Sequence, residues 1–381
     1  KCTPDHPLLT RHGYVSAISA KQVTFPLVQH HSEDKEAITA RLFGYLLGDG
    51  WLSKGKPRQG GFSGKKSNGD LLKIKEDLNR LGLNSSNIFT RTTRSQIKDA
   101  SGTIAVVEGE SSSIHFSEKA FAFFSSLGGP VGDRTLQRID VPRWILQGSE
   151  KVKTEFIGGL MGSDGQRISA AKNARGDFNP VRLSFNKDIS LEKEAFTFAF
   201  QLKTLFNDLG IVISDIRRRP GNLRKDGIKT LKIVLTLAKN NQNIVRFLEK
   251  VGYRYCHDKE QQGLLWLEYL KAREHERYKR FGLKNKAWEL AVKYGIGKTR
   301  VSRLLRVKEY EARNWLYKDY KPGVPKKFDS FDQWIKKRLT GNFIFETIVA
   351  VENAGVEDVY DITVEDTHNF VANGLISHNC H

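Results

Sequence analysis

Apolar and polar residues alternate at both ends of the chain, whereas the middle has helical spacing. Apolar residues recur at about every second position in the segments NFIFETIVAVE at 342–352 and VYDITVE at 359–365. This alternation is typical of paired strands. The opening HPLLTRHGYVSAISAKQVTFPLV at 6–28 also favours short strands and turns. We therefore expect β structure at the two ends, flanking a more helical middle.

An internal repeat occupies the middle of the chain. LFGYLLGDGWLS at 42–53 matches IGGLMGSDGQRIS at 157–169, which makes Asp49 and Asp164 equivalent. An amphipathic helix ending in a leucine–glycine step follows each copy, DLLKIKEDLNRLGL and TFAFQLKTLFNDLGI. In the first of these helices, Gly82 is placed to adopt the left-handed conformation that ends a helix. Two copies of one α/β unit predict a pseudo-twofold domain.

Glycines four residues apart mark each copy of the repeat, and the sequence pairs Gly44 with Gly48 and Gly158 with Gly162. Small residues at this spacing let two helix backbones approach closely, so we expect the two helices to pack on each other. Each helix would end at an Asp-Gly step, with the glycine as its terminator. The two aspartates would then meet at the pseudo-twofold axis.

Two carboxylates at the negative ends of two helix dipoles repel each other unless a cation neutralises them. Hard oxygen ligands with open water positions suit Mg²⁺, and such a metal can activate water for phosphodiester cleavage. A plainer interpretation is that Asp-Gly is a common turn and that glycine-rich helices occur in ordinary cores. Two copies on a basic background favour the metal site.

The charge of the chain indicates a polyanionic partner. Lys and Arg number 62 against 43 Asp and Glu, which gives a net charge of +19 and a pI near 9.7. The excess is concentrated in residues 263–340, whereas residues 341–379 contain no basic residue, so a domain boundary falls near Thr340. Nucleic acid is the partner that this charge favours.

Membrane and redox chemistry are poorly supported by the sequence. No apolar run approaches the roughly 20 residues that span a bilayer, and no signal-peptide pattern is present. The three scattered cysteines form neither a disulfide framework nor a zinc spacing. We expect a soluble, cytoplasmic protein.

The two aspartate motifs resemble those of LAGLIDADG homing endonucleases in their two-copy, single-chain form, over residues 35–262. VPRWI at 141–145 also resembles a segment that often precedes the second motif of this family. The resemblance implies a pseudo-twofold αββαββα domain in which Asp49 and Asp164 are the Mg²⁺ ligands. It also implies a monomer that binds a long asymmetric site in double-stranded DNA.

The same resemblance implies a basic residue beside each active site. Lys259, in GYRYCHDKE, and Arg134 or Arg138, in GDRTLQRIDVP, are the candidates. The alternative is that these residues are only DNA-facing charge.

A second DNA-reading element is predicted in ELAVKYGIGKTRVSRLLRV at 289–307, where apolar positions would bury two helices against each other and Gly295 would form the bend. This is a helix-turn-helix pattern, whose second helix enters the major groove. An amphipathic helix pair with a solvated basic face is the alternative. The side chains predicted to face DNA are Lys298, Thr299, Arg300, Ser302 and Arg303.

The final residues of the chain, HNFVANGLISHNCH, combine groups suited to peptide-bond chemistry. The side-chain amide of Asn379 can attack its own carbonyl and cut the bond to Cys380. His378 could act as general acid or base toward that carbonyl, and His368 could carry a proton. Cys380 would be the nucleophile that accepts an acyl chain before the cut.

VYDITVEDTHNFVANGLISHNC resembles the C-terminal splicing blocks of inteins. On that match Asp361 and His368 fall at the functional acid and histidine, Asn379 is the last intein residue, and Cys380 and His381 belong to the downstream extein. TPDHPLLTRHGYV similarly resembles the intein block that carries Thr-x-x-His. In this block Thr3 and His6 would promote the first acyl shift.

The expected fold is an α+β multidomain protein. Residues 1–34 and 341–379 would form an all-β Hint splicing domain from the two chain ends, followed by extein residues 380–381. The endonuclease, 35–262, and a basic helical DNA-recognition region, 263–340, would be inserted between them.

Inteins also begin with a Cys or Ser nucleophile in a block upstream of Thr-x-x-His, and Cys2 is too close to His6 to serve. We therefore expect a truncated or naturally split intein, with the missing N-terminal segment and the exteins as partners. Alone it would at most cleave at Asn379.

Two other functions remain open. One is a free-standing LAGLIDADG endonuclease or RNA-splicing maturase, which the tail from Val359 to Cys380 disfavours. The other is a helix-turn-helix regulator without catalysis, which would bind DNA but leave it uncut.

Overall fold

The computed structural model describes residues 2–27, 31–55, 58–64, 69–98, 104–172, 177–224, 226–325, 327–341, 343–358, 362, 364 and 368–378. The chain divides into two compact units. The terminal unit comprises residues 1–29 and 326–381, and the central unit comprises residues 30–325. The expected boundaries lay at 34/35 and 340/341. Residues 30–34 instead belong to the central unit, and the helix at 331–338 belongs to the terminal unit.

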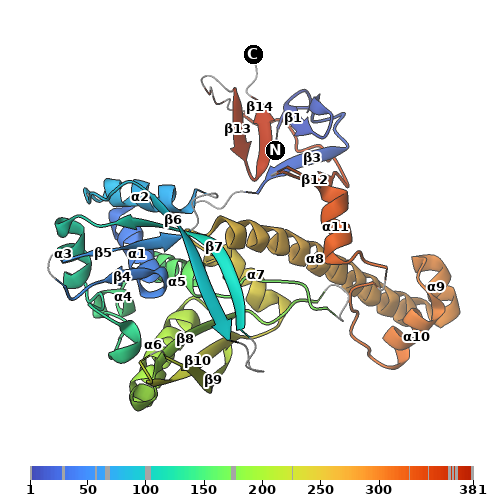
Figure 1. The fold of residues 1–381 in the computed structure, drawn as a ribbon. Coiled ribbons are helices and arrows are strands. Elements are labelled where there is room, and N and C mark those ends of the chain that lie inside the picture. Colours follow the sequence, from blue (N-terminus) through green and yellow to red (C-terminus); the bar gives the residue numbers. More distant parts are fainter. Residues whose placement is uncertain are drawn as a thin grey trace. The chain divides into compact units, whose positions relative to one another are not determined.

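The terminal unit joins the two ends of the chain in β sheets, as the alternating pattern predicted. Strands from the start and end of the sequence, blue and red in Figure 1, lie side by side. One sheet has the order β13-β14-β1-β2 and the other β11-β12-β3. The elements are β1 (Pro7–Thr10), β2 (Gly13–Ser16), β3 (Gln22–Pro26), α11 (Phe331–Arg338), β11 (Leu339–Thr340), β12 (Phe343–Thr347), β13 (Asn369–Ala372) and β14 (Leu375–His378).

One predicted strand is shorter than expected. β12 ends at Thr347, and the described stretch 348–358 is irregular, although its residues alternate. Thr347 pairs with Gln22, which is the first residue of β3, so the partner strand ends at the same point. Val349 and Val351 are consequently exposed. An alternating sequence forms a strand only where a neighbouring strand can take its hydrogen bonds.

The central unit is mixed α/β, and the same order of elements follows Asp49 and Asp164. The first half contains α1 (Lys35–Asp49), β4 (Gly50–Leu52), β5 (Gly60–Gly64), α2 (Asp70–Arg80), β6 (Phe89–Lys98), β7 (Ile104–His115) and α3 (Glu118–Ser126). The second half contains α5 (Glu150–Ser163), β8 (Arg182–Asp188), α6 (Glu192–Asp208), β9 (Ile213–Leu223), β10 (Lys229–Leu237) and α7 (Asn241–Lys250). The short turns η1 (Arg134–Leu136) and α4 (Arg143–Leu146) connect the halves.

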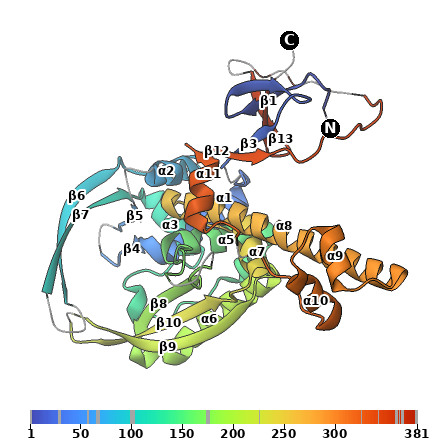
Figure 2. The ribbon, with the colours of Figure 1, turned by 90° about the vertical axis from the view of Figure 1, so that its right-hand side faces the viewer.

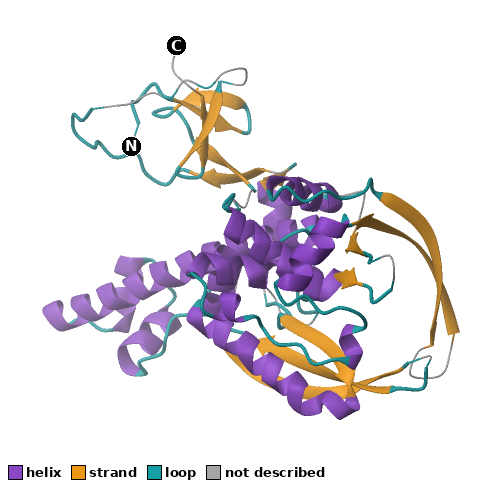
Figure 3. Cartoon of the chain, turned by 90° about the vertical axis from the view of Figure 1, so that its left-hand side faces the viewer, coloured by secondary structure: helices purple, strands orange, loops and turns teal. Residues whose placement is uncertain are grey.

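Each half contains one antiparallel sheet. The first has the order β4-β5-β7-β6, and its strands β6 and β7 form a long ribbon, visible in Figure 3. The second has the order β8-β10-β9, and α6 packs along it (Figure 2). In the second half, isolated bridges such as Gly165 to Leu183 take the place of the strand that corresponds to β4. Gly82 has the predicted left-handed conformation, with φ of 68°.

The central helices α1 and α5 are in direct backbone contact. A Cβ atom on Gly44 would lie 2.0 Å from the carbonyl oxygen of Phe156, and one on Gly159 would lie 2.0 Å from that of Arg41. Farther along, a Cβ on Gly48 would lie 1.9 Å from the Oγ of Ser163. No side chain can occupy these positions without separating the helices.

The prediction that Gly158 and Gly162 face α1 was wrong. A Cβ on Gly162 would instead lie 1.7 Å from the carbonyl oxygen of Arg254, and Gly158 faces the Arg254 side chain. Counted back from the two aspartates, Gly44 and Gly48 correspond to Gly159 and Ser163, so the predicted glycine pair of α5 is one residue out of register. α1 does end at Asp49 with Gly50 as its C-cap, but Gly50, with φ of −100°, is extended rather than left-handed and begins β4.

Buried ion pairs link α1 and α5 to the residues that surround them. The Nε and Nη2 atoms of Arg41 donate to the two carboxylate oxygens of Asp77 at 2.7 and 2.8 Å, and Tyr255 joins the same carboxylate. Arg254 donates to both oxygens of Glu155 on α5 at 3.0 Å. Removing one partner of such a pair would leave a buried charge uncompensated, at a cost of about 3–5 kcal/mol.

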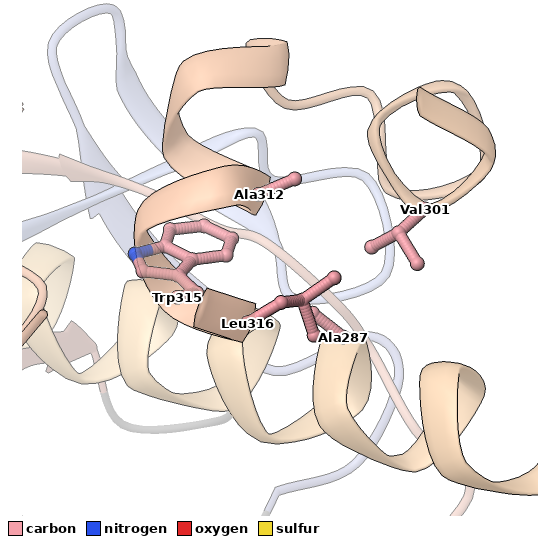
Figure 4. Packing of buried hydrophobic residues seen from close by; sticks show 5 residues of the cluster. All are labelled: Ala287, Val301, Ala312, Trp315 and Leu316. Carbon is pink, nitrogen blue, oxygen red and sulfur yellow. The ribbon is translucent and has the colours of Figure 1, made fainter. Parts of the chain in front are cut away.

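The helix-turn-helix prediction matches the backbone of three helices at the end of the central unit. They are α8 (His257–Tyr294), α9 (Lys298–Leu305) and α10 (Glu309–Tyr317). The bend falls at Gly295, which has φ of 61°. Leu304 lies outside the core, with 58% of its surface exposed. Side chains from all three helices meet in a small core, drawn in Figure 4: Ala287, Val301, Ala312, Trp315 and Leu316.

Among the described helices, even α8 falls short of the apolar character required to cross a membrane.

Gly159→Ala tests the helix contact, and Gly282→Ala is its matched control. Gly282 is also helical, but a Cβ atom on it would meet no neighbouring group within 4 Å. We expect Gly282→Ala to raise the free energy of unfolding by about 1 kcal/mol, as alanine does in an open helix. Gly159→Ala should lower it by about 3 kcal/mol because the helices must separate. Urea unfolding measures both, and equal effects would contradict the contact.

Candidate functional site

Two aspartates end the two central helices. Asp49 is the last residue of α1, and Asp164 directly follows α5. Both reach solvent, yet protein surrounds them on most sides. Burial raises the pKa of Asp49, and burial together with the charge of Asp49 raises the pKa of Asp164 to about 6. The helix pair therefore brings Asp49 close enough for its charge to affect the ionisation of Asp164.

A cation caps each of these helix ends. The Nζ of Lys259 donates to the carbonyl oxygens of Gly162 and Ser163 at 2.7 and 2.6 Å. Arg134 donates to the carbonyl oxygens of Leu46, at 3.0 Å, and Leu47. The two residues thus neutralise the negative end of each helix dipole, and their charges offset the cost of the adjacent carboxylates. Burial lowers the pKa of both cations.

Arg138 does not reach this site. Its Nε pairs with the carboxylate of Asp140 at 2.6 Å, and 65% of its side chain is exposed. The choice between Arg134 and Arg138 could not be made from the sequence, since both lie in one loop. The η1 turn directs Arg134 toward the end of α1.

Lys187 is a third cation at the site, and sequence reasoning missed it. It lines a cavity of about 200 Å³ together with Asp164 and Arg134. Its Nζ donates to the carbonyl oxygens of Arg134 and Gln137, the latter at 2.8 Å. Burial, with the neighbouring Arg134, lowers the pKa of Lys187 to about 8.

The strand pattern contained a signal for Lys187. In RLSFNKD, Leu183, Phe185 and Lys187 share one face of β8, and Leu183 and Lys187 are buried. A lysine at an inward position of a strand is rare unless it has a specific partner.

The donor set favours a hard cation. Two carboxylates with solvent access can bind Mg²⁺ and leave positions for water. Within the described ranges, no third His, Cys, Asp or Glu joins them. The pair lacks the soft or nitrogen ligands that favour zinc.

The predicted DNA-facing residues of α9 differ in their surroundings. Arg300 and Arg303 are exposed. Lys298 and Thr299 contact the carboxylate of Glu309 at 2.9 and 3.2 Å, and these hydrogen bonds lower the pKa of Glu309. Ser302 instead donates its hydroxyl to the carbonyl oxygen of Val307 at 2.8 Å, which stabilises the turn after α9.

The terminal unit forms the second site, built around His378. The rings of His368 and His378 lie 5.9 Å apart, and the edge of Tyr14 contacts His378 with ring centroids 5.2 Å apart. β1 pairs with β14 through Leu8 and Ser377, so residues near the start of the chain reach its final strand.

The Thr-x-x-His block lies in the same unit. The ring of His6 packs against Phe370 of β13 at 6.2 Å. The carbonyl oxygen of Thr3 accepts a hydrogen bond from the backbone N–H of His6 at 3.2 Å, whereas the Thr3 side chain hydrogen-bonds to Asp5 and lowers the pKa of that residue. Asp361, Asn379 and Cys380 lie outside the described residues.

The intein splicing domain family matches residues 1–379, and the chain belongs to this family.

Curated relatives cover nearly the whole chain but extend well beyond it. A replication factor C small subunit of Methanocaldococcus jannaschii is 30% identical over 92% of this chain and 18% of its own length. A tRNA-splicing ligase RtcB of Pyrococcus furiosus is 28% identical over 99% of this chain and 42% of its own length. The chain therefore spans less than half the length of either relative.

Among solved structures, the LAGLIDADG meganuclease I-CpaMI bound to uncleaved DNA aligns with 64% of this chain and 94% of its own. The TM-score is 0.31 and the sequence identity is 11%.

Replacing Asp49 by Asn tests the coupling between the two carboxylates. Because the negative charge of Asp49 opposes ionisation of Asp164, its removal should lower the pKa of Asp164 from about 6. The value should stay above the usual 3.8, since burial is the larger cause. Carboxyl-carbon NMR titration of the metal-free protein measures the shift.

Asp208→Asn is the control, because Asp208 also ends a helix but lies elsewhere, where it pairs with Lys153. An unchanged Asp164 titration in the Asp49→Asn variant would show that the two carboxylates do not interact.

Proposed function

We propose that this chain combines two activities: C-terminal peptide cleavage during intein-mediated protein splicing, and site-specific, Mg²⁺-dependent cleavage of double-stranded DNA. The observation that carries the first is the presence of His6 in the same β unit as the neighbouring rings of His368 and His378, a unit made from both chain ends. The second is carried by the paired carboxylates of Asp49 and Asp164 with their capping cations.

The splicing step is cyclisation of Asn379. Its side-chain nitrogen attacks its own backbone carbonyl carbon, a succinimide forms, and the bond to the nitrogen of Cys380 breaks. His378 donates a proton to the departing nitrogen or polarises the carbonyl, and His368 exchanges protons with it. Asp361 supports these histidines, and Cys380 carries the upstream acyl chain before the cut. Thr3 and His6 act at the opposite splice junction.

The relatives support a mobile element of this kind. Replication factor C and a tRNA-splicing ligase have unrelated names, yet this one chain matches a part of each. A segment inserted into unrelated proteins explains that distribution. The partners of this chain are then the flanking exteins.

The nuclease step uses the central unit. Asp49 and Asp164 would hold Mg²⁺, which supplies water activation and charge stabilisation when bound. Lys259 and Arg134 keep the helix ends neutral, so the carboxylates stay ionised beside each other. Lys187, with a pKa near 8, is placed to exchange a proton in the cavity beside Asp164.

DNA recognition would extend to the helix-turn-helix. Arg300 and Arg303 are exposed one turn apart on α9, where side chains of a recognition helix meet base edges. Lys298 and Thr299 would contact DNA after release from Glu309, and Ser302 would hold the turn. The match to the intein splicing domain family over residues 1–379 argues against a free-standing endonuclease or maturase. A regulator without catalysis would not explain the paired carboxylates of Asp49 and Asp164.

Asp164→Asn tests the nuclease. The wild-type chain is first incubated with Mg²⁺ and a library of plasmids that carry random inserts. It should linearise only some of these plasmids, and one of them is selected as the substrate. The variant should cut the selected plasmid at least about a hundred-fold more slowly, since it loses one of the two carboxylates that would hold Mg²⁺. Asp208→Asn, again at a helix end, should cut like the wild type.

The same selected plasmid separates recognition from chemistry. Arg300→Ala with Arg303→Ala should weaken binding and reduce its salt dependence, whereas Arg313→Ala, an exposed arginine on α10, should not. Plasmid that is bound but never cut by the wild type would contradict the nuclease and favour a regulator.

Asn379→Ala tests the splicing chemistry. With a folded reporter fused after His381, the wild-type chain should release the reporter, which a gel detects. The variant should release none because no side-chain amide can attack, and His378→Ala should slow release about a hundred-fold. Asn353→Ala, at an exposed asparagine of the same unit, should leave the rate unchanged. Equal release by wild type and Asn379→Ala would sink this part of the proposal.

A further inference from the structure

Tyr14 contacts the last residue of β14 and the first residue of β13. Its ring meets the ring of His378 edge-on, with centroids 5.2 Å apart and an interplanar angle of 72°. Its hydroxyl donates to the Oδ1 of Asn369. Asn369 lies directly opposite His378 in the β13–β14 pair. One side chain from β2 therefore touches both members of a single cross-strand pair.

Strand register puts these residues on the same face of the sheet. Tyr14 pairs with Leu9, and Leu8 pairs with Ser377, so Tyr14 and His378 share the face opposite to Leu8 and Ser377. Leu8 and Ser377 are buried, at 7% and 3% exposure, whereas Tyr14 is 40% exposed. The contact thus forms on the solvent side, where a histidine ring is not fixed by a core.

His378 is the last residue of β14, directly before Asn379 in the sequence. A second ring lies nearby: His368, held in a left-handed conformation with φ of 55°, has its ring 5.9 Å from that of His378. The imidazole of His378 consequently has Tyr14 and His368 as ring neighbours, with Asn369 opposite it on β13.

We infer that Tyr14 is a positioning residue for C-terminal cleavage, which orients the His378 ring toward the adjacent scissile bond. This inference rests on the proposed function of His378. Proton transfer depends steeply on geometry, and a misplacement of about 1 Å can cost about a hundred-fold in rate. Tyr14 acts through the ring edge, and its hydroxyl bond to Asn369 fixes the ring in place.

The test uses the full chain with a reporter after His381 and the variants Tyr14→Val and Tyr14→Phe. Valine preserves strand propensity at this half-exposed position, so the variant should fold. We expect Tyr14→Val to slow release about ten-fold or more and Tyr14→Phe, which keeps the ring, to slow it at most about three-fold. Phe343→Ala is the matched control, because Phe343 is an aromatic residue of the same unit with 39% exposure.

Proton NMR supplies a readout that a merely structural role would not move. In the wild type, the His378 ring protons should show nuclear Overhauser contacts to the Tyr14 ring and a ring-current shift. The shift should disappear in Tyr14→Val, persist in Tyr14→Phe, and be unaffected by Phe343→Ala.

The outcomes separate the inference from the function on which it rests. Absence of the ring contacts in the wild type, or release by Tyr14→Val at the wild-type rate, would overturn the role of Tyr14 alone. If the wild-type chain releases no reporter, the proposed cleavage fails, and the role of Tyr14 in it fails as well.

Discussion

The close backbone contact between α1 and α5 is the constraint on which the central unit depends. Gly44 and Gly159 leave no space for a side chain, so the two helix ends are brought together with Asp49 and Asp164 beside each other. Proximity of two carboxylates is costly, and the structure offsets it with Arg134 and Lys259 bound to the helix carbonyls. Burial, together with the charge of Asp49, leaves the pKa of Asp164 raised. A divalent cation would remove the repulsion between the carboxylates, which links the packing of glycines to the proposed phosphodiester chemistry.

In the terminal unit, strand pairing brings together residues that are remote in sequence. Residues separated by nearly the whole sequence must meet for the two splice junctions to be processed in one place. Antiparallel pairing of β1 with β14 achieves this, and the neighbouring strands β2 and β13 add Tyr14, His6's partner Phe370 and Asn369. The chemistry of each unit therefore follows from main-chain contacts between segments that are remote in sequence.

Much of this arrangement could be predicted from local patterns. The left-handed Gly82, the bend at Gly295 and the β character of both ends depend on nearby residues, and the structure agrees with each. Other features depend on tertiary contacts. Which glycine of α5 faces α1 is decided by the register of two helices, and which arginine reaches the site is decided by one turn. The position of Tyr14 beside His378 could be recognised only once the order of the strands was known. Among the described residues, no strand pairs with the stretch 348–358, and the sequence pattern could not show this.

We propose that the α1–α5 contact creates a two-carboxylate metal site, and anomalous X-ray scattering from crystals of the full chain grown with Mn²⁺ is its most direct test. We expect a peak bound by oxygens of both Asp49 and Asp164. Separated aspartates, or Mn²⁺ bound only at other positions, would contradict it.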